Sequence, residues 1–268
     1  MLRRFAFALL LLLPTLAGAQ ARKPIIVTGS TTIYPLMTDV VQRFKRQNPR
    51  VLIEVSSGGS GRGLADLRNG VSEIAMVSRE LSDSERDLFA FPLCRDGAAI
   101  VVHRSNALKG LSSQQLSDVL TGRISDWKQL GARPGAIKLA WREEGQAIPE
   151  LIMQHLKLRP EQIHSDAVIL ENREAIAFVA NDRNAVTLAA LGVAERSLKS
   201  GKAIKLLAYG GIPASTRTVR DHTYLLSRPL LLVTRTPPTG LQKRLIDFAA
   251  SGAVTDLQEK HGFVPYQD

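Results

Sequence analysis

The chain has few of the residues that build metal sites or disulfides. Its 268 residues contain a single cysteine, Cys94, which cannot form an intramolecular disulfide and is expected to be a small buried residue. The five histidines are isolated in sequence, and no Cys/His cluster has metal-ligand spacing. After the N-terminal segment, no apolar run reaches the length of a transmembrane helix. We therefore expect no disulfide framework, metal or other cofactor.

The N-terminus has the pattern of an export signal. Arg3 and Arg4 precede an apolar run over residues 5–16, and small residues follow at 17–19. This predicts a signal peptide over residues 1–19, cut before Gln20. No cysteine lies near the cleavage site, which argues against a lipid anchor. We expect a soluble, monomeric protein of the periplasm.

Basic residues outnumber acidic ones, with a formal net charge of +10 for the whole chain. Without the predicted signal peptide, 33 basic residues face 25 acidic ones, a net charge of +8. Such a surface suits anionic ligands. The export signal argues against nucleic acid, and the basic residues are scattered rather than clustered. The length and a hydrophobic content of 44% fit one large or two ordinary α/β domains.

The first motif of the mature chain combines a strand, hydroxyl residues and a helix start. Residues 25–29 form a β-branched run that ends in glycine, Ser30, Thr31 and Thr32 follow, and Pro35 opens a segment with helical spacing. The first turn of a helix has unpaired N–H groups and a partial positive charge, so these hydroxyls could cradle an oxyanion. The alternative interpretation is a helix cap, which is the commoner use of Ser and Thr at such a position.

The same pattern recurs twice in the next fifty residues. A predicted strand over residues 51–55 leads into a Gly-rich loop with Ser60 and Gly61, and a strand over residues 73–77 ends in Ser78 and Arg79. A β-α-β order predicts parallel strands, whose ligands gather at the carboxyl ends. The three loops are therefore expected at one sheet edge. For Arg79, a surface salt bridge with Glu80 or Asp83 is the competing interpretation.

A second lobe is expected from the apolar strand over residues 98–103 onward. The predicted strand over residues 138–141 delivers Arg142, where an anion ligand from an opposing lobe would lie. Glu143 and Glu144 follow without a nucleophile or base nearby, so they are interpreted as salt-bridge partners. A helix with apolar spacing from Ile148 to Leu156 comes next.

Several segments together resemble one known family. They are IVTGSTTIYPL (26–36), SSGGSGRGLADLRNG (56–70), EIAMVSREL (73–81), RDGAAIVVH (95–103), LSSQQLSDVLTGRISDWKQLG (111–131), REEG (142–145), LLSRPLLLVTRTPPTGLQKRLIDFAASGAV (225–254) and HGFVP (261–265). In this order they resemble the phosphate-binding proteins of bacterial phosphate ABC importers. The resemblance implies an α/β fold of the type II periplasmic binding protein class, with two lobes, a central cleft and two crossover strands. Lobe 1 would comprise residues 20–98 and 225–268, and lobe 2 residues 99–224.

The resemblance also implies a ligand site, with one departure from the family pattern. The implied ligand-binding residues are Ser30, Thr31, Thr32, Ser60, Gly61, Ser78, Arg79 and Arg142. After Arg142 the family continues Glu-Glu-Gly-Ser-Gly-Thr-Arg, whereas this chain reads Glu-Glu-Gly-Gln-Ala-Ile-Pro. Two hydroxyls and a glycine are replaced by Gln146, Ile148 and Ala147. Because a hydrogen bond to a charged group is worth about 1.5–3 kcal/mol, their loss could weaken phosphate binding by orders of magnitude.

Three functions are compatible with these patterns. The first is a periplasmic solute-binding protein that holds phosphate or a related tetrahedral oxyanion for an ABC importer. The second is a degenerate homologue that senses or scaffolds without tight phosphate binding. An enzyme is the third and weakest, since the sequence has no Gly-x-Ser-x-Gly elbow and no evident nucleophile with a base.

Overall fold

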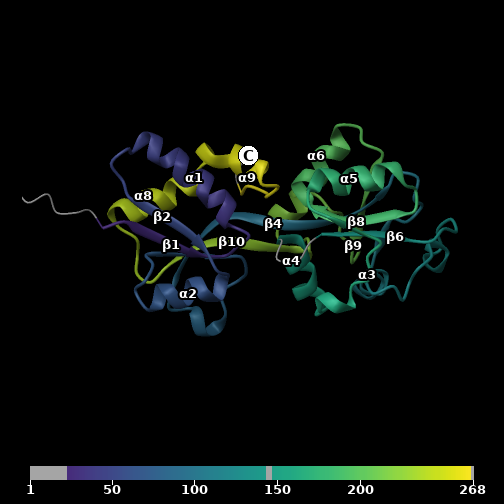
Figure 1. Cartoon of the computed structure of the whole chain (residues 1–268), viewed down its shortest axis with the longest axis horizontal. Helices are drawn as coiled ribbons and strands as arrows, with labels where there is room; N and C mark the ends of the chain where they lie inside the picture. Colours follow the sequence, from purple (N-terminus) through teal and green to yellow (C-terminus); the bar gives the residue numbers. More distant parts are fainter. Residues whose placement is uncertain (1–22, 143–146, 267–268) are drawn as a thin grey trace, which may run out of the picture.

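The computed structural model describes residues 23–142 and 147–266, with only the backbone of Arg142. The predicted signal peptide, residues 143–146 and the last two residues lie outside this range. The described chain forms two lobes placed side by side along the long axis (Figure 1). The α/β two-lobe fold predicted from the sequence is confirmed.

Three parallel strands begin the first lobe. They are β1 (Ile25–Gly29), β2 (Ile53–Ser57) and β3 (Ile74–Val77), and β1 lies between the other two. Helix α2 (Ser60–Arg68) covers one face, and α1 (Tyr34–Gln47), α8 (Gly240–Ala249) and α9 (Thr255–Lys260) cover the other (Figure 1). The apolar face predicted for the first helix is buried, from Leu36 to Phe44.

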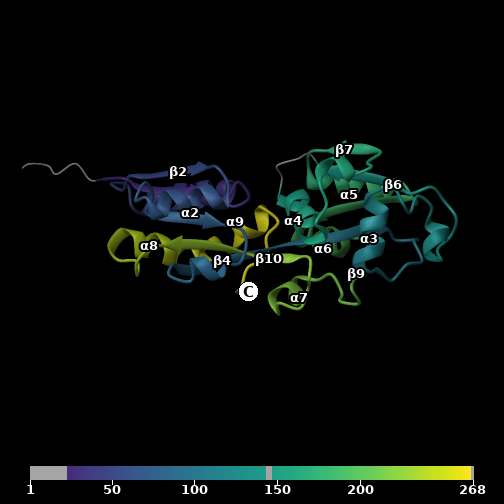
Figure 2. The ribbon, with the colours of Figure 1, turned by 90° about the horizontal axis from the view of Figure 1, so that it is seen from below.

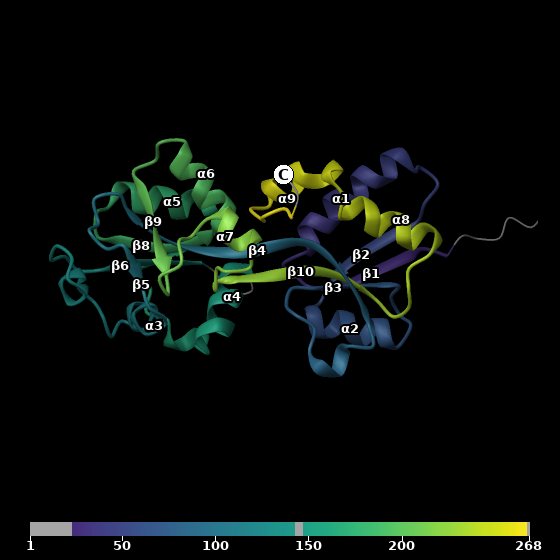
Figure 3. The ribbon, with the colours of Figure 1, turned by 180° about the vertical axis from the view of Figure 1, so that it is seen from behind.

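Two long antiparallel strands connect the lobes. The first half of β4 (Phe89–His103) pairs with β10 (Ser227–Thr234), which also pairs with β3. The second half of β4 pairs with β8 (Ala185–Ala190) and β9 (Ile204–Tyr209) in the second lobe. Figure 3 shows both strands running between the lobes. One continuous strand is thus shared by both lobes.

The second lobe completes the sheet and packs helices on both of its faces. Its other strands are β5 (Gly110–Leu111), β6 (Lys138–Arg142) and β7 (Ala167–Ile169), and its helices are α3 (Ser113–Leu120), α4 (Ala147–Leu156), α5 (Asn172–Asn181), α6 (Leu191–Lys199) and α7 (Thr216–Arg220). The strand order β2-β1-β3-β10-β4-β8-β6-β7 runs through both lobes. Figures 1 and 2 show α4 close to the first lobe.

Each lobe has its own buried apolar cluster. Ala98, Leu226 and Val264, at the margins of predicted lobe 1, pack in the cluster of the second lobe. Val264 also pairs with Arg95 of β4 through two backbone hydrogen bonds of 2.9 and 2.8 Å. The C-terminal segment after α9 therefore lies against the connection, and the exact lobe boundaries remain a prediction.

The structure corrects the predicted bounds of several elements. Strand β4 begins at Phe89, nine residues before the predicted start, because Pro92, Arg95 and Asp96 interrupt the apolar pattern of what is nevertheless a continuous strand. After β3 the chain forms a short 3₁₀ turn, Asp83–Glu85, with a capping box. Within the described ranges, no helix has the length and apolar character to cross a bilayer.

Candidate functional site

The three strands of the first lobe end at the same level. In the sheet register, Gly29 of β1 lies opposite Ser57 of β2 and Met76 of β3. The loop after β1 is tied to this edge, since the Ser30 N–H donates to the Met76 carbonyl at 2.8 Å. The N–H groups of Gly58 and Gly59 both donate to the Gly29 carbonyl at 2.9 Å. The predicted meeting of the loops at one edge is confirmed.

Gly29 and Gly63 make this close approach possible. Gly29 has a φ of +132°, and a Cβ at that position would lie 2.3 Å from the Met76 carbonyl oxygen. A Cβ on Gly63 of α2 would lie 2.6 Å from the Gly29 Cα atom. Because backbone atoms cannot yield at such distances, both positions require glycine. Helix α2 is thereby held against the end of β1.

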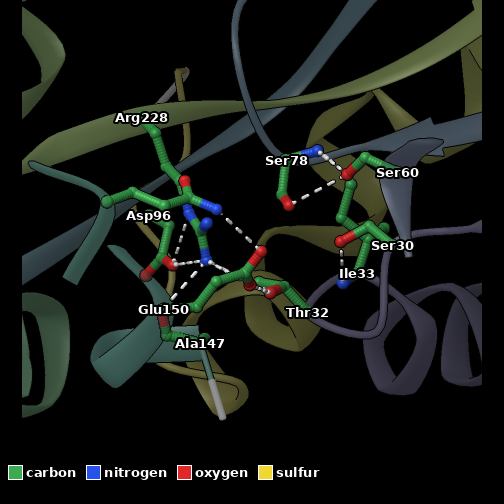
Figure 4. Close-up of polar contacts among 10 residues, drawn as sticks. Ser30, Thr32, Ile33, Ser60, Ser78, Asp96, Ala147, Glu150 and Arg228 are labelled. Atoms are coloured by element: carbon green, nitrogen blue, oxygen red, sulfur yellow. Dashed lines mark hydrogen bonds and ion pairs between the residues drawn. The ribbon is translucent and has the colours of Figure 1, made fainter. Parts of the chain in front are cut away.

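The hydroxyl loop before α1 points two side chains inward and one outward. Ser30 and Thr32 are buried, whereas Thr31 is exposed. Ser30 Oγ accepts one long hydrogen bond, of 3.4 Å, from the Ile33 N–H (Figure 4). The N-cap residue of α1 is Ile33, with no side-chain cap. The hydroxyls are therefore not used as the usual caps of this helix.

The second and third loops share a pair of serines. Ser60 starts α2, and its Oγ atom accepts a hydrogen bond of 3.1 Å from the Ser78 N–H. The two hydroxyl oxygens are 3.3 Å apart, and Ser78 is buried (Figure 4). Gly61, in the same first turn of α2, is exposed. The pair places two rotatable O–H groups at the edge of the sheet next to the first loop.

A buried arginine at the start of β10 contacts the first of these loops. Arg228 is only 5% exposed, and its Nη2 atom donates to Thr32 Oγ1 at 3.2 Å and to the Ala147 carbonyl at 3.0 Å. The same nitrogen lies 3.3 Å from Asp96 Oδ2 and from Glu150 Oε2 (Figure 4). Nη1 is buried and has no hydrogen-bond partner within the described chain. A guanidinium with one free, buried N–H₂ group suits an anion.

Asp96 is the buried counter-ion of this arginine. Its side chain is 1% exposed on β4, and burial raises the pKa of its carboxyl group while the Arg228 guanidinium lowers it. Oδ1 is buried and has no partner among the described residues. A buried polar atom without a partner is costly, so an unpaired acceptor and an unpaired donor within one buried ion pair indicate a place for a ligand.

Helix α4 closes the site from the second lobe. Glu150, in its first turn, accepts a hydrogen bond of 3.3 Å from the Thr32 hydroxyl. Ala147 and Ile148 line a cavity of about 260 Å³ together with Thr31, Thr32 and Asp96. The wall contributed by these two α4 side chains is apolar. A larger cavity of about 890 Å³ between α5, α6 and α9 does not reach the hydroxyl loops.

The predicted ligand residues fall into two groups. Ser30, Thr32, Ser60 and Ser78 come together, whereas Thr31 lies at the exposed rim of the cavity and Gly61 lies exposed on α2. Arg79 is paired through two hydrogen bonds of 2.8 and 2.9 Å with Glu85, which holds the pKa of that carboxyl at about 2. The side chain of Arg142 and residue Gln146 lie outside the described part of the chain.

Three residues of the site escaped the sequence reasoning: Arg228, Asp96 and Glu150. Arg228 and Asp96 each lie within a segment that resembles the family, 225–254 and 95–103, but the resemblance assigns neither of them to the ligand site. Arg228 and Asp96 share one sequence signal, since each is a charged residue within an otherwise apolar strand. A charged side chain buried at such a position needs a partner of opposite charge. In the described chain, no group of three or more His, Cys, Asp or Glu side chains could hold a metal ion.

Comparison with known proteins defines the class of this chain. It belongs to the PBP superfamily, the periplasmic binding proteins, because the family described as "PBP superfamily domain" matches residues 14–253. This agrees with the type II periplasmic binding protein fold expected from the sequence.

The most informative relatives carry names connected with phosphate. "Phosphate-binding protein PstS" of Borreliella burgdorferi is 24% identical over 90% of each chain, and its Bacillus subtilis namesake is 23% identical over 93% of this chain and 83% of that one. A crystal structure titled as an ABC-type phosphate transport receptor from Vibrio cholerae has a TM-score of 0.73 at 28% identity, covering 90% of this chain and 99% of the other. The chain is thus similar over nearly its whole length to proteins of this kind.

Proposed function

We propose that the chain is an exported solute-binding protein that holds phosphate, or a related tetrahedral oxyanion, for an ABC importer. The observation that carries the proposal is the buried Arg228, whose Nη1 group has no partner in the described chain and whose Nη2 atom contacts Thr32 in the first hydroxyl loop. The names of the relatives support the same ligand class. No chemistry on the ligand is proposed, and the partner would be a membrane importer rather than nucleic acid.

The site can satisfy a dehydrated oxyanion from several sides. Hydroxyls of Ser30, Thr32, Ser60 and Ser78 can rotate to donate, and the Arg228 Nη1 group can donate two further hydrogens. The unpaired Oδ1 of Asp96 requires a donor, which a protonated oxygen of hydrogen phosphate would supply and fully ionised sulfate would not. Hydrogen phosphate and sulfate carry the same net charge, so the discrimination between them comes from this hydrogen bond to Asp96.

The proposal extends to the location of the protein and to the division of the chain into lobes. We propose export through the segment 1–19, a monomeric state, and a hinge in the connecting strands between residues 20–98 with 225–268 and residues 99–224. Arg142 is retained as a proposed ligand from lobe 2, because β6 ends there beside the start of α4.

Isothermal titration tests the ligand. The mature protein is unfolded, dialysed to remove anions, refolded and titrated with phosphate and with sulfate in separate runs. We expect saturable heat with phosphate at one site per chain and at least tenfold weaker binding of sulfate. No heat at millimolar phosphate would remove phosphate as the ligand.

A degenerate homologue that senses or scaffolds is the second candidate. The observation that favours it is the apolar wall formed by Ala147 and Ile148, where the family pattern has a glycine and a hydroxyl. If restoring Ser, Gly and Thr at positions 146–148 created phosphate binding that the parent lacks, this second candidate would replace the first.

A further inference from the structure

The carboxylate of Glu150 lies where an oxyanion would be expected to bind. Oε2 accepts from the Thr32 hydroxyl at 3.3 Å and lies 3.3 Å from Arg228 Nη2. A hydroxyl and a guanidinium are also the kinds of donor that bind an oxyanion, so the Glu150 carboxylate makes the contacts that the ligand would make. Figure 4 shows Glu150 reaching between the two side chains.

The Nη2 atom of Arg228 has more acceptors than hydrogens. Its two hydrogens face four oxygens within 3.3 Å: Thr32 Oγ1, Asp96 Oδ2, Glu150 Oε2 and the Ala147 carbonyl. Because these hydrogens are already shared, a ligand oxygen can bond to this nitrogen only by taking the place of one of the four acceptors. The carbonyl is backbone and the Asp96 side chain is 1% exposed, whereas the Glu150 side chain is 37% exposed. Glu150 is therefore the acceptor free to move.

The charges around Arg228 also indicate that Glu150 moves when an anion binds. Around the single positive charge of Arg228 stand the carboxylates of Asp96 and Glu150. A third anion added to this group would be repelled at short range by both carboxylates. Withdrawal of Glu150 into solvent would remove one of these repulsions, free the Thr32 hydroxyl hydrogen and vacate one acceptor position at Arg228 Nη2 for the ligand.

We propose that Glu150 is an internal competitor of the ligand, a specificity-determining residue that sets the affinity of the site. This rests on the proposed function. In the ligand-free protein its carboxylate joins α4 of the second lobe to Thr32 of the first and to Arg228, so it also acts as a latch between the lobes. A bound oxyanion takes over both donors and expels the carboxylate. The apparent affinity is reduced by the fraction of molecules in which the latch is closed.

The test compares four proteins in phosphate titrations: the wild type, Glu150→Ala, Glu150→Gln and the control Glu161→Gln. Glu161 is 65% exposed in its pair with Arg159 and does not line the cavity, so it controls for the change in net charge. Ala removes the carboxylate without adding a donor, whereas Gln could add one. We expect both position-150 variants to bind phosphate about tenfold or more tightly than the wild type, and the control to match it.

Small-angle X-ray scattering of the ligand-free proteins provides a readout that does not depend on phosphate. We expect a larger radius of gyration for Glu150→Ala than for the wild type, because the latch is gone. If the wild type binds phosphate and Glu150→Ala binds no tighter, the competitor role is wrong. If none of the four proteins binds phosphate, the proposed function is wrong, and an unchanged radius of gyration would then overturn the latch as well.

Discussion

The two lobes make opposite contributions to the cleft. The first lobe ends three parallel strands in buried or half-buried serine and threonine hydroxyls held by close glycine contacts. Helix α4 of the second lobe presents Ala147, Ile148 and the carboxylate of Glu150. The first lobe thus offers hydrogen-bond donors to an anionic ligand. The second lobe offers apolar side chains and the negatively charged carboxylate of Glu150. Fold and ligand affinity are therefore separable in this molecule, because the second lobe can keep its packing while its share of the site changes.

Arg228 lies between the two sides, and its loss should have the largest effect. Arg228→Gln removes the buried cation, so phosphate binding should fall by at least about a thousandfold. It also leaves Asp96 buried without a counter-ion, which should lower the free energy of unfolding by about 3–5 kcal/mol. Titration calorimetry and urea denaturation measure the two effects.

The double variant Arg228→Gln with Asp96→Asn separates these consequences. It should recover much of the stability but none of the binding, since the uncompensated charge is gone while the cation is still missing. Arg43→Gln, which removes the exposed pair with Asp256, serves as a control for both measurements. Full phosphate affinity in Arg228→Gln would show that the connecting strand has no part in the site.

The hydroxyl side is tested next by Ser60→Ala. This change removes a donor to the ligand and the acceptor of the Ser78 N–H. At about 1.5–3 kcal/mol for a hydrogen bond to a charged group, affinity should fall about tenfold to a hundredfold. Ser84→Ala, in the exposed Ser82–Ser84 pair, is the matched control and should titrate like the wild type. Equal affinities in all three proteins would mean that the first lobe does not hold the ligand.

The apolar side is tested by Ile148→Thr. Ile148 lines the cavity from α4, and threonine would place a hydroxyl there. We expect phosphate affinity to rise by up to about tenfold, measured by titration calorimetry, at a cost to stability from the lost apolar volume. Ile148→Val, which adds no donor, is the control. A similar gain with valine would attribute the effect to space rather than to the hydroxyl.

The smallest effect is expected at Glu85, the partner of Arg79. The folded pKa of Glu85 is about 2, below its ordinary value of 4.5, so the ion pair stabilises the fold above pH 4.5 and this contribution is lost as the pH falls toward 2. Glu85→Gln should lower the free energy of unfolding by about 1 kcal/mol at pH 7. In urea titrations at a series of pH values, the difference from the wild type should shrink below pH 4.5 and disappear only as the pH passes below the folded pKa of about 2.

The same variant sharpens the role predicted for Arg79. A rise in phosphate affinity in Glu85→Gln would show that Arg79 can bind the anion once it is released from its ion pair with Glu85. If affinity stayed unchanged, its function would be to hold the loop after β3.

The sequence predicted the elements that depend on local pattern and missed those that depend on tertiary partners. The loops after β1, β2 and β3 were predicted to meet, because parallel strands fix where their ends lie. Strand β4 was predicted too short, since a charged pair such as Asp96 with Arg228 looks like a loop until its partner 132 residues away is known. For Glu150, helical spacing gave no sign that the side chain crosses between the lobes.

Anomalous X-ray diffraction from crystals of the anion-stripped protein soaked in arsenate would test the central claim most directly. Arsenate is a tetrahedral phosphate analogue whose arsenic atom gives its own signal. We predict one strong peak between the Arg228 guanidinium and the hydroxyls of Thr32, Ser60 and Ser78, with the Glu150 side chain turned away. A peak elsewhere, or none at millimolar arsenate, would contradict the account.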